Sequence, residues 1–114
     1  MKYWMANWYE DMRAKRSFEI GNVFLGERVL SIKKETEKAV LCEVQGYHLT
    51  NNEVYGEDDV WLPKKAFVFI DMDGVKYFNE RNAKASTKWL KSLKEKWATQ
   101  VVEEIKGVQE KWKK

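Results

Sequence analysis

The spacing of hydrophobic residues changes once along this chain, and that change constrains the fold more than any other feature. Between residues 17 and 78, short apolar runs alternate with polar residues and are separated by glycine, a pattern typical of β-strands. From residue 79 to residue 114, apolar residues recur every three or four positions, which predicts a helix. We therefore expect an α+β fold.

The middle region predicts about five strands. After Phe18, Ile20 and Phe24, the apolar runs are residues 29–32, 39–44, 60–62, 66–70 and 75–78. Asp73-Gly74 between the last two runs predicts a tight hairpin, because glycine adopts positive φ without strain. The acidic stretch from Leu49 to Asp59 is typical of a long polar loop. Five short strands of this kind predict a small antiparallel barrel, OB-like or SH3-like.

Helices are expected on both sides of this β region. Tyr3, Trp4 and Trp8 recur at helical spacing, so residues 1–16 predict a short amphipathic helix. Residues 79–114 predict one long helix, with Trp89 and Trp97 on its buried side and a possible break at Gly107. With 114 residues, the chain is expected to form a single domain, 1–114, built from the helix 1–16, the β region 17–78 and the helix 79–114.

The composition leaves few catalytic options. One cysteine cannot form an intramolecular disulfide, and one cysteine with one histidine cannot supply the usual zinc ligand sets. No phosphate-binding glycine loop, nucleophile motif or paired-carboxylate signature is present, so we expect no enzyme activity, no metal and no cofactor. Cys42 lies in an apolar run and is expected to be a buried thiol in a reducing compartment.

Charge is distributed unevenly along the chain. The net charge is +3, but residues 79–114 carry ten Lys or Arg and five Glu, a local net of +5. Such asymmetry is compatible with an anionic partner and also with an ordinary solvated helix surface. No signal-peptide pattern or membrane-length apolar run is found, so we expect the cytoplasm, with no membrane partner.

Lysines and aromatic residues are interleaved in the β region, as in domains that stack bases and neutralise phosphates. The same aromatic residues could instead complete the core of a small barrel. The candidate nucleic-acid-binding residues combine this face with a basic strip on the last helix: Lys33, Lys34, Tyr55, Trp61, Lys64, Lys65, Tyr77, Lys84, Lys88 and Lys91.

Two short segments resemble a pattern in small, mostly uncharacterised phage- and plasmid-type proteins. Thr36-Glu37-Lys38-Ala39-Val40-Leu41 matches a strand introduced by T-x-K-A, and Trp61-Leu62-Pro63-Lys64 matches a strand ending in W-[IVL]-P-K. The resemblance extends over Ile32 to Val44 and Val60 to Lys64, and the region from 32 to 64 is about a quarter of the chain. It implies a mobile-element origin, a bacterial host cell and a small β-barrel, and it supplies no activity.

Two functions fit these patterns. The first is a non-enzymatic phage-type accessory protein that binds nucleic acid, preferably single-stranded, through the candidate residues. The second is a protein-protein interaction module, such as a phage inhibitor of a host enzyme or of a defence nuclease, similar in role to anti-CRISPR proteins. It would use exposed aromatic residues or the acidic stretch from Glu53 to Asp59. Trp89, Trp97 and Trp112 also make a homodimer plausible.

Overall fold

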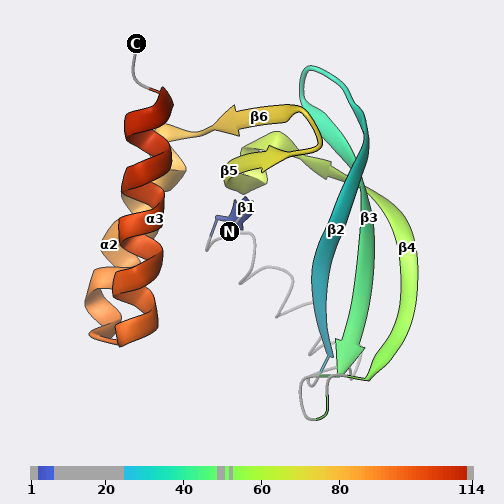
Figure 1. Ribbon diagram of the computed structural model, residues 1–114, viewed down its shortest axis with the longest axis horizontal. Coiled ribbons are helices and arrows are strands. Elements are labelled where there is room, and N and C mark those ends of the chain that lie inside the picture. Colours follow the sequence, from blue (N-terminus) through green and yellow to red (C-terminus); the bar gives the residue numbers. More distant parts are fainter. Residues whose placement is uncertain (1–2, 7–24, 49–50, 52, 113–114) are drawn as a thin grey trace. The chain divides into compact units, whose positions relative to one another are not determined.

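A computed structural model of the chain describes residues 3–6, 25–48, 51 and 53–112 (Figure 1). It contains two compact units. The helical unit consists of Met1–Asn7 and Lys65–Lys114, and the sheet unit consists of Trp8–Lys64. The combination of helices and antiparallel sheets confirms the α+β class.

The helical unit is built on an antiparallel sheet in the order β1 (Tyr3–Met5), β5 (Phe67–Met72), β6 (Val75–Phe78). The central strand β5 is buried on both faces at Phe67, Val68, Phe69 and Ile70, which explains its uninterrupted apolar run. The predicted hairpin is confirmed: Met72 pairs with Val75, and both turn residues between them have positive φ. Positive φ at both positions is the geometry of the type I′ turn that Asp-Gly favours.

Two helices follow β6 and pack on this sheet, α2 (Glu80–Leu93) and α3 (Lys96–Trp112). Asn79 caps α2, because its side-chain oxygen accepts a hydrogen bond from the Asn82 amide nitrogen at 2.9 Å. The hydrophobic core of the unit joins both helices to β5 through Val68, Phe69, Ala83, Leu90, Ala98, Val101, Val102 and Ile105.

The prediction of one helix over residues 79–114 is wrong. The helix ends at Lys94, which adopts the left-handed conformation with φ of 53°, whereas Gly107 lies inside α3. A single helix of that length would extend about 54 Å, and its apolar stripe, with steps near four, would drift around the axis. The break lets both halves bury their apolar residues on the same unit. Trp89 and Trp97, predicted to be buried, lie on either side of it and are 41% and 47% exposed.

The sheet unit contains an antiparallel sheet in the order β2 (Leu25–Glu35), β3 (Ala39–His48), β4 (Val54–Pro63). Val40, Cys42 and Val44 of the central strand are buried and share one face. The predicted loop from Leu49 to Asp59 is wrong for residues 54–59, which pair with β3 as part of β4. Polar residues are tolerated there because an edge strand is exposed and charges protect it from unwanted pairing.

Two further expectations need correction. The N-terminal helix over 1–16 does not include Tyr3–Met5, which form β1, because the open edge of β5 supplies the backbone hydrogen bonds of a strand. Residues 7–16, as well as Phe18, Ile20 and Phe24, lie outside the described residues. The described strands form two three-stranded sheets and not one closed five-stranded barrel. A single domain over 1–114 stays a prediction.

The buried amide of Asn82 connects α2 to the segment before β5. Its Nδ2 donates to the carbonyl oxygens of Lys65 at 2.7 Å and Phe67 at 2.8 Å. We expect Asn82→Ala to lower the free energy of unfolding by about 1 to 3 kcal/mol, because buried carbonyls lose their donor. Urea unfolding followed by circular dichroism measures this. Lys88→Ala, on the exposed side of α2, is the control, and equal unfolding midpoints for the two variants would contradict the assigned role.

Candidate nucleic-acid interface

The candidate residues fall on both units. Lys33, Lys34, Tyr55, Trp61 and Lys64 belong to the sheet unit, whereas Lys65, Tyr77, Lys84, Lys88 and Lys91 belong to the helical unit.

On the sheet unit, acidic and basic side chains already pair across the strands. Lys33 Nζ donates to Asp59 Oδ2 at 2.9 Å and lies 3.8 Å from Glu43 Oε2. The hydrogen bond to Asp59, with the charges of both carboxylates, raises the pKa of Lys33. Farther along the same strands, Gln45 Oε1 accepts a hydrogen bond from Arg28 Nε at 2.7 Å, and Gln45 Nε2 donates one to Glu57 Oε1 at 3.0 Å. This face thus has little uncompensated positive charge for a polyanion.

The other candidates of the sheet unit differ in what they can offer. Lys64 begins the short 3₁₀ helix η1 (Lys64–Ala66), and its ammonium group pairs with Glu35. Lys34 is exposed on β2. Trp61 is 50% exposed and lies across from Leu41 in the β3–β4 ladder. Tyr55 belongs to β4, and its side chain lies outside the described part of the structure.

The helical unit holds its lysines differently. Lys84, Lys88 and Lys91 are exposed on α2 and, with Arg81, follow steps of three, four and three residues. This spacing places all four cations along one side of the helix, over a length of roughly 15 Å. We call Arg81, Lys84, Lys88 and Lys91 the α2 basic strip. Its one described ion pair is between Lys84 and Glu80 at 3.7 Å, with both side chains largely exposed. Such a pair contributes little and leaves the strip positive.

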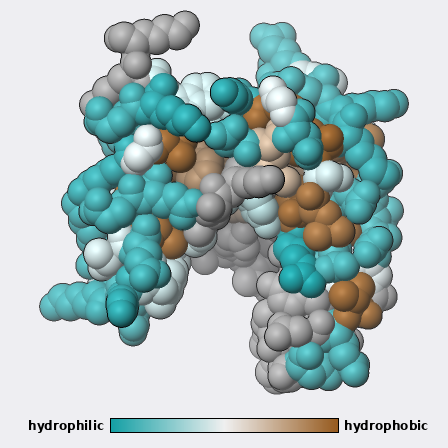
Figure 2. All heavy atoms as spheres, in the orientation of Figure 1, coloured by the Kyte–Doolittle hydropathy of each residue, from teal (hydrophilic) through white to brown (hydrophobic). Residues whose placement is uncertain are grey.

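Other residues of the helical unit have smaller roles in such an interface. Lys65 is exposed at η1. Tyr77 is half-buried, and its hydroxyl oxygen accepts a hydrogen bond from Asn79 Nδ2 at 3.1 Å, so it supports the residue that caps α2. Figure 2 shows that the surface over the two helices, on the left, is largely hydrophilic.

Sequence reasoning missed two features close to the helix break. Trp89 and Trp97 are exposed close to the helix break, and a cavity of about 170 Å³ opens between the helices, with Lys91, Lys94 and Lys106 in its lining. Glu103 also lines it and lies 3.7 Å from Lys106. The cavity is lined in part by Lys94, the residue at which α2 ends. The left-handed conformation of Lys94 has no clear local signal in the sequence, because Lys is a good helix former.

The described residues show no constellation for metal or nucleophilic chemistry. Among them, no group of three or more His, Cys, Asp or Glu side chains could hold a metal ion. Burial raises the pKa of the Cys42 thiol from 9.0 to about 11. No helix within the described segments is long and apolar enough to cross a membrane.

No family model, curated protein or solved structure matches this sequence. The resemblance of Thr36–Leu41 and Trp61–Lys64 to phage- and plasmid-type proteins therefore stays a prediction.

The raised pKa predicts that Cys42 is inert in the folded protein. At about pH 8, an increase of two pKa units lowers the thiolate fraction roughly 100-fold, and burial also blocks the reagent. We expect reaction with an aromatic disulfide reagent to be at least roughly 100-fold slower in native buffer than in denaturant. Absorbance of the released thiolate measures both rates. Comparable rates would contradict the burial of Cys42.

Proposed function

We propose that this protein binds single-stranded nucleic acid and that the α2 basic strip makes the main phosphate contacts. The observation that carries the proposal is the alignment of four exposed cations, three of them without an ion pair to a described residue, on one side of a single helix. The candidates on the sheet unit take a secondary place, because Lys33 and Lys64 are already paired with carboxylates.

Two indoles that are exposed close to the helix break, Trp89 and Trp97, favour a single strand over a duplex. Trp89 precedes Leu90 and Lys91 in the last turns of α2, and Trp97 follows in the first turn of α3. Unstacked bases can pack on such rings, with about 1 to 3 kcal/mol per stacked base, whereas the bases of a duplex are already stacked. Lysines and indoles together would therefore bind the backbone and the bases of one strand.

Reversing the charge of the strip should abolish this binding. For Lys84→Glu/Lys88→Glu/Lys91→Glu, we expect at least a tenfold loss of affinity, and the slope of log K against log salt should become smaller by about 2, since each phosphate contact to a single strand contributes about 0.7. Fluorescence anisotropy with an oligonucleotide of about 15 nucleotides, titrated across salt concentrations, measures both quantities.

The matched control is Lys34→Glu/Lys38→Glu/Lys65→Glu, which changes the net charge equally at exposed lysines outside α2. It should retain affinity within a few-fold, and this result would remove Lys34 and Lys65 from the candidate binding residues. Equal losses of affinity for the two triple variants would show that binding depends on the overall net charge and not on the strip. Salt-independent binding by the unmodified protein would exclude a phosphate-based interface.

Trp89 should contribute stacking. For Trp89→Leu, which keeps an apolar side chain against α2, we expect the binding free energy for a single strand to weaken by about 1 to 3 kcal/mol. Affinity for a duplex of the same sequence should change little. Trp61→Leu, on the sheet unit and similarly exposed, is the control, and an equal loss in both variants would contradict a specific role for Trp89.

A second candidate function is supported by β4. This edge strand combines Trp61, Val60 and Val54, all exposed, with Glu57, Asp58 and Asp59. An exposed indole on a strand edge is a typical anchor for a protein partner. A stoichiometric protein partner, captured by the unmodified protein and by the α2 triple variant but lost in Trp61→Ala, would favour an interaction module.

A further inference from the structure

A charged row crosses the sheet of the helical unit beside its apolar core. Phe69 is paired with Trp4 on β1 and with Phe78 on β6, so these three side chains lie on one face and pack against the core shared with the helices. The next row on the same face, two residues along the strands, is Asp71 opposite Lys76. The face thus changes from apolar to charged within one step of the pleat.

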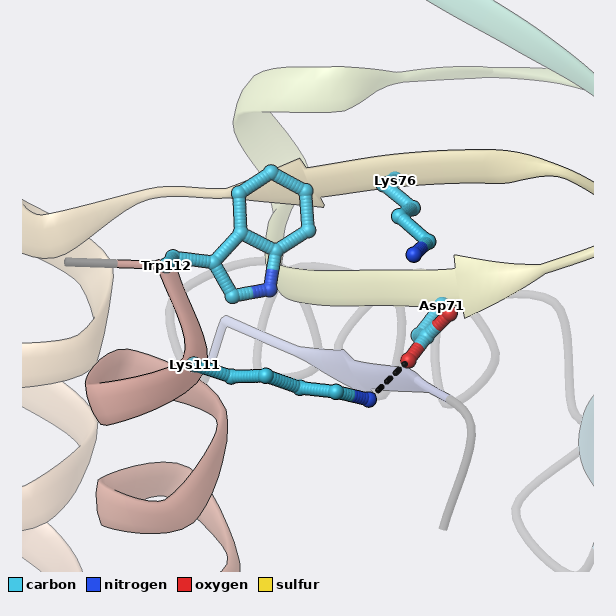
Figure 3. Close-up of a pocket in the computed structure, with 4 residues that line it drawn as sticks. All are labelled: Asp71, Lys76, Lys111 and Trp112. Carbon is cyan, nitrogen blue, oxygen red and sulfur yellow. Dashed lines mark hydrogen bonds and ion pairs between the residues drawn. The ribbon is translucent and has the colours of Figure 1, made fainter. Parts of the chain in front are cut away.

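The end of α3 meets this charged row and leaves a hollow. Lys111 Nζ donates to Asp71 Oδ2 at 3.4 Å, and Trp112 follows as the last residue of the helix. Figure 3 shows the Trp112 indole, the Lys76 side chain and the Asp71 carboxylate around the same space. This pocket, which we call the Trp112 pocket, has a volume of about 190 Å³ and is lined by Asp71, Lys76, Lys111 and Trp112.

The groups around the Trp112 pocket define the chemistry of its occupant. The half-buried indole offers an aromatic wall. Lys76 is exposed and makes no ion pair with another described residue, so its ammonium group is available to an anion. Lys111 engages only one Asp71 oxygen, and the carboxylate remains partly exposed, so the second oxygen can accept a hydrogen bond from an amino group.

The size of the pocket limits what can enter. Drug-sized ligands occupy roughly 300 to 1,000 Å³, so about 190 Å³ holds one planar ring and little more. A ring that stacks on an indole, carries an amino group and is attached to an anion corresponds to a nucleotide with an amino-bearing base. Lys76 also lies on β6, which leads through Asn79 directly into α2 and its basic strip.

We propose that the Trp112 pocket holds the amino-bearing base of one nucleotide, stacked on Trp112 and directed toward Asp71, and that the phosphate of this nucleotide binds Lys76. The proposal rests on the proposed function insofar as the nucleotide belongs to a bound strand. A free nucleotide would offer the pocket the same base and phosphate groups. Cytosine and thymine test the base preference, because they have similar stacking area and differ at the amino group that Asp71 would recognise.

The experiment compares oligodeoxycytidine with oligothymidine of equal length by fluorescence anisotropy. We expect the unmodified protein to bind oligodeoxycytidine about tenfold more tightly, in line with one hydrogen bond to a charged acceptor. Asp71→Asn should bring the two affinities within about twofold, because the amide can also donate to the thymine carbonyl. The control Asp73→Asn makes the same chemical change in the hairpin turn, outside the pocket, and should keep the preference.

A second arm tests the pocket with a free nucleotide. Cytidine monophosphate is titrated while the Trp112 indole N–H signal, assigned by its loss in Trp112→Leu, is followed by NMR. A shift in the unmodified protein that is lost in Asp71→Asn, without binding of either oligonucleotide, would overturn the strand-binding function and retain the pocket for free nucleotides.

The remaining outcomes separate the two proposals as well. If the two oligonucleotides bind with equal affinity, or if Asp71→Asn leaves the preference unchanged, the proposed base recognition in the pocket is overturned. The proposed role of the α2 strip would then remain. No binding of oligonucleotides and no shift of the Trp112 signal would overturn both. Asp71→Asn is expected to fold, because the ion pair that it removes is partly exposed and has an N–O distance of 3.4 Å, and a thermal melt checks this.

Discussion

The burial of β5 on both faces is the constraint around which the helical unit is organised. Four consecutive residues, Phe67 to Ile70, have almost no exposed surface, and a strand of this kind needs partners along its edges as well as cover over its faces. The edges are filled by β6, next in the sequence, and by β1, from the opposite end of the chain. The apolar face around Phe69 is covered by α2 and α3, and the chain reverses direction at Lys94 so that both helices pack against this face.

The charges are arranged by the same packing. Once the apolar sides of α2 and α3 face the core, cations spaced at three and four residues gather on the solvent side of α2. On the sheet unit, contacts between distant segments instead bring Lys33 to Asp59 and Lys64 to Glu35. Similar residue types therefore give a compensated polar network on one unit and an uncompensated positive strip on the other. This difference is why the proposed function rests on α2.

Two expectations that depend on local signals agree with the structure. The Asp73-Gly74 turn has its cause in two adjacent residues, and the strand beginning at Ala39 follows from a continuous apolar run. By contrast, Tyr3–Met5 have helical spacing with the residues that follow and yet pair with β5, more than sixty residues away in the chain. Residues 54–59 are polar enough for a loop, but β3 offers them a complete ladder of backbone partners. In both cases non-local pairing outweighs the local pattern.

The sequence by itself determined the α+β class, the hairpin and the basic character of the segment that becomes α2, because turn chemistry, hydrophobic period and charge are properties of neighbouring residues. Only the tertiary structure decided which lysines keep their charge uncompensated and which indoles stay exposed. It also brought Asp71, Lys76 and Trp112 around one pocket. Those outcomes depend on strand register and on where α3 ends over the sheet, and both are set by contacts between segments distant in the chain.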